Sequence, residues 1–113
     1  MQVVNNLILD TVGALDGDWR NISNFIALSI HVVGLDADTY IEASNDPASA
    51  SGVRITGNIG LGDPSLTDEI AIFYGPVNTV MVNPSCLAWN YIRVTKGAGG
   101  AVETKAWLFG QNG

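Results

Sequence analysis

The stretch Phe25-Ile26-Ala27-Leu28-Ser29-Ile30-His31-Val32-Val33 decides the fold class. In an extended chain, successive side chains point to opposite faces. One face of this stretch would carry branched apolar residues and the other smaller or more polar ones: Ile26, Leu28, Ile30 and Val32 against Ala27, Ser29 and His31. This period of two predicts a β-strand over 25–33 with one face in a hydrophobic core.

Seven further short runs of apolar or alternating residues surround this strand, at 7–11, 39–43, 53–56, 70–74, 77–82, 89–95 and 102–109. Thirteen glycines and four prolines punctuate the chain, as turns punctuate strands. Only 63–70 could form a helical turn, and it is too short for a longer helix. About eight strands without crossover helices predict a single all-β domain over residues 1–113. Its expected architecture is a two-sheet antiparallel β-sandwich of the jelly-roll type.

The last third of the chain is predicted to form a hairpin, because the runs 89–95 and 102–109 flank the glycine-rich stretch 97–100. In the first run, Ile92 and Val94 would point to the core. In the second run, one set of alternate residues would face the core and the other would face away from it: Val102, Thr104, Ala106 and Leu108 against Glu103, Lys105, Trp107 and Phe109.

Charge limits the classes of partner. Charged residues make up 14% of the chain, against about 25% in an average soluble domain. The five basic residues are scattered and the net charge is −6, so neither nucleic acid nor an anionic membrane surface is an expected partner. The single cysteine excludes an intrachain disulfide framework and a cysteine-based zinc site. Low charge also leaves much of the surface neutral, which favours contact with other protein chains.

The residues that carry chemistry in enzymes form no catalytic motif here. His31 is the single histidine and lies mid-strand without a nucleophile elbow elsewhere, and Cys86 has no nearby cation to lower its pKa. The stretch 97–100 lacks the spacing of a phosphate loop. The chain is therefore predicted not to be an enzyme, with no catalytic residue, no cofactor and no metal. The Asp-x-Asp pairs at 16–18 and 36–38 leave a calcium site open as an alternative to solvated turns.

Trp107 and Phe109 give the stronger functional signal, because they lie on the strand face opposite the predicted core residues. Each buries about 150–250 Å² when covered. Loops of the same chain could cover them, or they could contact another protein.

Two segments resemble elements of a known family. Thr39-Tyr40-Ile41-Glu42-Ala43-Ser44-Asn45-Asp46 resembles a strand of the small β-sandwich virion proteins of tailed bacteriophages, and Ala88-Trp89-Asn90-Tyr91-Ile92-Arg93-Val94 with Ala106-Trp107-Leu108-Phe109-Gly110 resembles their closing hairpin. The resemblance covers roughly residues 25–110 in element order. It implies a capsid decoration (cement) protein on the capsid surface of a virion, or a tail, baseplate or fibre component.

A cement protein would bridge neighbouring major capsid subunits, and the resemblance implies a homo-oligomer, a dimer or trimer. On this hypothesis the expected contact residues are Trp107, Phe109, Tyr91 and Arg93. The alternative is a carbohydrate-binding module, in which Trp19, Tyr40 and Trp89 would stack against sugars.

Overall fold

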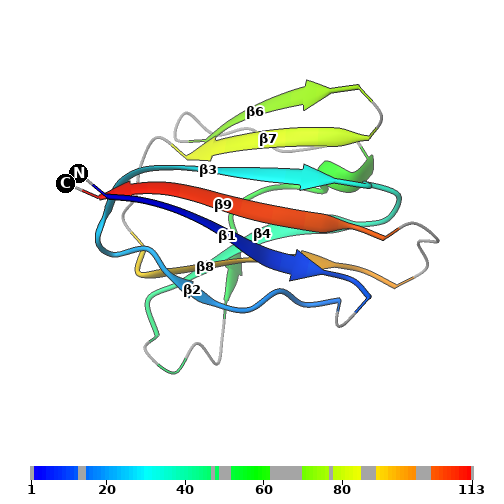
Figure 1. Ribbon diagram of the computed structural model, residues 1–113. Helices are drawn as coiled ribbons and strands as arrows, with labels where there is room; N and C mark the ends of the chain where they lie inside the picture. Colours follow the sequence, from blue (N-terminus) through cyan, green and yellow to red (C-terminus); the bar gives the residue numbers. More distant parts are fainter. Residues whose placement is uncertain are drawn as a thin grey trace.

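The protein is an all-β sandwich of two antiparallel sheets (Figure 1). The computed structural model describes residues 2–12, 15–46, 48, 52–61, 70–76, 78–84, 89–98 and 103–112. Within these ranges there are nine strands and one short 3₁₀ turn, η1 (Ile59–Leu61). The predicted fold class is confirmed.

The larger sheet has five strands in the order β1-β9-β3-β7-β6. Their bounds are β1 (Gln2–Asp10), β9 (Lys105–Asn112), β3 (Phe25–Val33), β7 (Thr79–Pro84) and β6 (Ile70–Gly75). The central strand β3 is the stretch from which the fold class was inferred, and its observed bounds equal the predicted ones.

The smaller sheet has four strands in the order β2-β8-β4-β5. Their bounds are β2 (Arg20–Asn21), β8 (Tyr91–Lys96), β4 (Thr39–Ser44) and β5 (Val53–Arg54). The two outer strands β2 and β5 are only two residues long, so β8 and β4 form most of this layer.

The strand pairing is that of a jelly roll. The first strand pairs with the last, β1 with β9, and the second pairs with the last but one, β2 with β8. Only β4–β5 and β6–β7 are neighbours both in the chain and in a sheet. Because β1 and β9 run antiparallel, Gln2 lies opposite Asn112, and both ends of the chain emerge at the same edge of the molecule (Figure 1).

The core lies between the sheets and is made by alternate residues of the long strands. Leu28, Ile30 and Val32 of β3 are buried, as the period of two predicts. The inward residues of the other strands are equally well covered: Ile41, Ala43, Val80, Val82, Ile92, Val94, Ala106 and Leu108. Branched aliphatic side chains dominate this core, which suits the pleated inner faces of two packed sheets.

The prediction that Ile26 lies in the core was wrong. Ile26 is 68% exposed, although its spacing places it with Leu28 and Ile30. The pairing of β3 with β9 shifts register between Phe25 and Ala27. Such an irregularity re-aims the side chains on one side of it, so the alternation that holds from Ala27 onward does not extend back to Ile26.

The predicted closing hairpin was also wrong. β8 pairs with β2 and β4 in the smaller sheet, whereas β9 pairs with β1 and β3 in the larger one. The two strands therefore lie in opposite layers. Alternation and a glycine-rich connection fit a hairpin and a crossing between sheets about 10 Å apart equally well. In this fold both edges of β9 are already occupied by strands distant in the chain.

Several strand limits also differ from the predicted ones. β7 begins at Thr79 because Asn78 has a φ of 55°, which a turn accepts and a sheet ladder does not. β1 extends back to Gln2, β2 was not predicted, and β9 runs from Lys105 to Asn112 instead of over 102–109. The candidate helical turn at 63–70 lies outside the described residues, except for Ile70, which opens β6.

Candidate functional surfaces

The outer face of the five-stranded sheet carries a row of large side chains that crosses all five strands. In the pairing register, Leu7 of β1 lies beside Trp107 of β9, and Trp107 lies beside His31 of β3. His31 in turn lies beside Met81 of β7, and Met81 beside Phe73 of β6. We call this surface the apolar face, defined by Leu7, Trp107, His31, Met81, Phe73 and the adjacent Phe109.

Much of the apolar face is open to solvent. Phe73 is 59% exposed and Phe109 44%, while Leu7 and Met81 are also exposed. The ring of Trp107 lies 6.0 Å from that of His31, at an interplanar angle of 40°. Beside them is an open depression of about 510 Å³, lined by Asn5, Ser29, His31, Val33, Met81, Trp107 and Phe109. Exposed apolar groups gathered in this way are typical of interaction surfaces.

Beyond the β1 edge of the apolar face, Arg20 donates a hydrogen bond to the Leu7 carbonyl at 3.4 Å, whereas on the five strands themselves the described charged residues lie at one end. There Asp10 pairs in register with Lys105, whose ammonium lies 3.4 Å from Glu103. The Val12 amide donates a hydrogen bond to Asp10 and lowers the pKa of its carboxyl, against an opposing effect of desolvation; Glu103 and Lys105 lower it further. The centre of the face, around His31, is free of ionised carboxylates and of lysine and arginine.

The outer face of the four-stranded sheet has a different chemistry. Its centre is Glu42 of β4, whose carboxylate accepts a hydrogen bond from the Nε of Arg93 at 2.8 Å and lies 4.0 Å from the Nε of Arg54. The Arg93 guanidinium carbon lies 4.5 Å from the centroid of the Trp19 ring, and that of Arg54 lies 3.8 Å from the centroid of Tyr40. We call these five residues the arginine face.

Each charge of the arginine face is matched within the molecule. One carboxylate is shared by two guanidinium groups, and each guanidinium also lies over an aromatic ring, which favours a cation. Tyr91, two residues before Arg93 on β8, lies on the same side of the sheet. Arginine and tyrosine are residue types enriched among the strongest contributors to protein interfaces.

The four predicted contact residues therefore do not form one site. Trp107 and Phe109 point outward from the five-stranded sheet, whereas Tyr91 and Arg93 point outward from the four-stranded sheet on the other side of the core. Of the three aromatics considered for sugar stacking, Trp19 and Tyr40 lie on the arginine face and Trp89 does not belong to it. Arginine side chains cover one side of Trp19 and of Tyr40, and Trp89 packs against the core.

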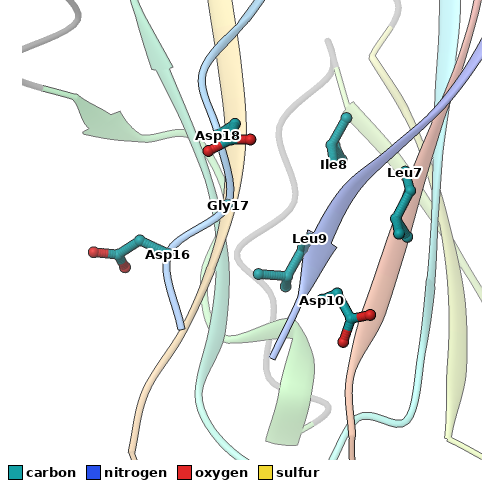
Figure 2. A pocket seen from close by; sticks show the side chains of 7 residues that line it. All are labelled: Leu7, Ile8, Leu9, Asp10, Asp16, Gly17 and Asp18. Carbon is teal, nitrogen blue, oxygen red and sulfur yellow. The ribbon is translucent and has the colours of Figure 1, made fainter. Parts of the chain in front are cut away.

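A second depression, of about 260 Å³, lies between β1 and residues 16–18 (Figure 2). Gly17 lies close to both sheets: its amide donates to the Val94 carbonyl at 2.8 Å, and a Cβ built on it would lie 2.5 Å from the Ile8 carbonyl oxygen. Asp10, Asp16 and Asp18 border the depression, but Figure 2 shows their carboxylates apart, with that of Asp16 pointing away from β1. This first Asp-x-Asp pair therefore does not converge on one point.

Both carboxylates of the second Asp-x-Asp pair, Asp36 and Asp38, contact polar side chains of the same protein. The Lys96 ammonium lies 2.5 Å from the Oδ1 of Asp36, and the Asn58 amide donates to the Oδ1 of Asp38 at 2.8 Å. Asn58 also accepts hydrogen bonds from the amides of Thr39 and Gly60. Among the described residues, no group of three or more His, Cys, Asp or Glu is arranged to hold a metal ion.

The remaining residues discussed in the sequence analysis, among them His31 and Cys86, form no catalytic arrangement within the described residues. His31 lies within the apolar face, without a described carboxylate or nucleophile beside it in the register. Cys86 lies outside the described residues, as do Gly99 and Gly100 of the glycine-rich stretch 97–100. Leu7, Phe73 and Met81 were not predicted as contact residues, because each lies in an apolar run of its own and only the pairing of strands into the sheet brings them into one row.

No helix in the described part of the chain is long and apolar enough to cross a membrane. Comparison with known proteins gives no further guide to these surfaces, since no family model, no curated protein and no solved structure matches this chain.

Proposed function

We propose that the protein is a structural virion protein, a capsid decoration (cement) protein that bridges and stabilises neighbouring major capsid subunits. The observation that carries this proposal is the placement of exposed aromatic side chains on one outer face of the sandwich and of arginine side chains stacked on aromatic rings on the other. A domain with contact surfaces on opposite sides can join two chains. The family resemblance of the segment at 39–46 adds to this.

The chemistry of the two faces supports binding rather than turnover. The two depressions described above are open, and neither brings together a nucleophile, a base and an orienting group. A protein repeated over a shell needs only modest contacts at each site, because many sites act together. We assign the contact with the shell to the arginine face and Tyr91, whose arginine and aromatic side chains suit a polar protein surface.

The test uses shells assembled without the protein. We expect the purified chain to bind them saturably and to raise the temperature at which they release their contents. Replacing Tyr91 by Ser should weaken binding to the shell at least about tenfold, whereas Val12→Ser, at a residue that is 77% exposed, serves as the matched control. Unchanged shell stability in the presence of saturating protein would reject the proposal. Saturable binding of the isolated domain to an oligosaccharide would instead favour a carbohydrate-binding module.

A further inference from the structure

We propose that the apolar face binds a second copy of the same chain, packed sheet against sheet about a two-fold axis that runs along β3. The proposal goes beyond the capsid function and does not depend on it, because it concerns the isolated protein. The arginine face, on the other side of the core, stays uncovered in such a dimer.

The position of β3 makes the apolar face suited to its own copy. β3 is the central strand of five, with β9 and β7 on either side and β1 and β6 at the edges. A two-fold rotation about β3 therefore places Trp107 against Met81 of the second copy, and Leu7 against Phe73 of the second copy. Methionine sulfur packs favourably against aromatic rings. His31, on the axis, meets its own counterpart, and neutral imidazoles can both donate and accept a hydrogen bond.

Charge does not oppose this contact, although each copy has a net charge of −6. The charges at the end of the face are Asp10, Lys105 and Glu103, of which Glu103 lies 3.4 Å from the ammonium of Lys105. In register, Asp10 and Lys105 share a row with Val33, Thr79 and Gly75. Rotation about β3 places Lys105 against Thr79 of the second copy and Asp10 against Gly75 of the second copy. Neither charge meets its like.

The area of the face is sufficient for a specific dimer only if the partner covers nearly all of it. Five strands, each about 4.8 Å wide, cover about 24 Å, and the seven rows from Val3 opposite Gln111 to Asp10 opposite Lys105, at about 3.4 Å a row, cover about 24 Å along the strands. The flat area is therefore about 600 Å² for each copy, or about 1,200 Å² in total, just above the roughly 1,000 Å² that a specific interface needs. A second sheet of the same size and shape covers the face fully.

A sugar is the rival occupant, because Asn5, Ser29 and His31 line the depression beside Trp107 and Phe109. Small-molecule sites enclose most of their ligand and fix it with converging polar groups. This depression is open, and the row continues beyond it to Leu7 and Phe73, which are apolar. Those two residues would remain exposed around a bound sugar, whereas a second copy covers them.

The first test is sedimentation equilibrium of the full chain over a range of concentrations. We expect a monomer–dimer equilibrium, and we expect Met81→Lys to raise the dissociation constant at least about 100-fold because it places two cations near the axis. Phe73→Lys, at a more exposed position, should also weaken the dimer. Val53→Lys is the matched control, since Val53 is 71% exposed on the other sheet. A monomer at all concentrations, or self-association unaffected by either apolar-face variant, would overturn the proposal.

The second test fixes the axis. Leu7→Cys and Phe73→Cys are each made in a Cys86→Ser background and treated with a short bismaleimide, which suits sheets about 10 Å apart better than a direct disulfide. A mixture of the two variants should cross-link, while each variant alone should not. Cross-linking of each variant only with itself would overturn the axis along β3. Loss of shell binding in Tyr91→Ser with the dimer intact would leave this inference standing, so the two proposals fail separately.

Discussion

The ammonium of Lys96 lies 2.5 Å from the Oδ1 of Asp36, and the lysine side chain is only 2% exposed. This ion pair joins β8 to the turn between β3 and β4. Removing one partner from a buried pair leaves an uncompensated charge, which is more damaging than loss of the attraction itself. Lys96→Met should therefore lower the free energy of unfolding by about 3 kcal/mol, as measured by urea denaturation.

The control for this prediction is Lys105→Met. The ammonium of Lys105 lies 3.4 Å from Glu103, and the two side chains are 39% and 42% exposed. Surface pairs of this kind contribute under about 1 kcal/mol. Equal losses of stability in the two variants would contradict the distinction between them.

Gly17 should tolerate no side chain. A Cβ at this position would lie 2.5 Å from the Ile8 carbonyl oxygen and 2.8 Å from that of Val94, and both are backbone atoms that cannot move aside independently. Gly17→Ala should destabilise the protein by about 2 kcal/mol. In Gly75→Ala the added carbon would meet nothing closer than 3.7 Å, so thermal unfolding of that variant should differ little from the wild type.

Arg93 should couple energetically to Glu42. Their hydrogen bond is 2.8 Å long and both side chains are largely covered, at 25% and 14% exposed. A charge-assisted hydrogen bond in such a setting contributes about 1.5–3 kcal/mol. A double-mutant cycle with Arg93→Met and Glu42→Gln should show a coupling energy of about 1 kcal/mol or more. If the losses of stability in the two single variants simply add up in the double variant, the pair has no interaction energy of its own.

Asp10 should make stability depend on pH in the acid range. Its pKa is lowered below 3.8, first by the hydrogen bond from the Val12 amide and then by Glu103 and Lys105. The folded state thus favours the ionised carboxylate of Asp10. The stability that this carboxylate contributes is present above its pKa in the unfolded state and is lost as the pH falls through its pKa in the folded state. Asp10→Asn should be less stable than the wild type near neutral pH, and the difference should vanish in acid. A carboxyl resonance of Asp10 that titrates above 3.8 would contradict this.

Local alternation predicted the inner face of the long strands well. Leu28, Ile30 and Val32, like Ile92 and Val94, are buried because side-chain direction in a strand depends only on neighbouring residues. Ile26 departs from this pattern because a register shift arises from pairing with β9, which lies some 80 positions further along the chain.

The surfaces were less predictable than the core. Leu7 and Trp107 are neighbours in space, but they belong to the first and last strands, and no local pattern reveals their pairing. The same holds for the closing hairpin, since a glycine-rich connection does not specify whether the next strand stays in the same sheet. The arginine face likewise joins residues from β4, β5, β8 and the segment before β2.

The pairing of Gln2 with Asn112 has a practical consequence. Paired residues of antiparallel strands lie about 5 Å apart, so a short peptide could join the two ends without disturbing either strand. New ends could then be opened at the exposed turn around Asn78, between β6 and β7. The resulting circular permutant would keep every inter-strand ladder while moving its attachment point for a fused cargo to the opposite edge of the larger sheet.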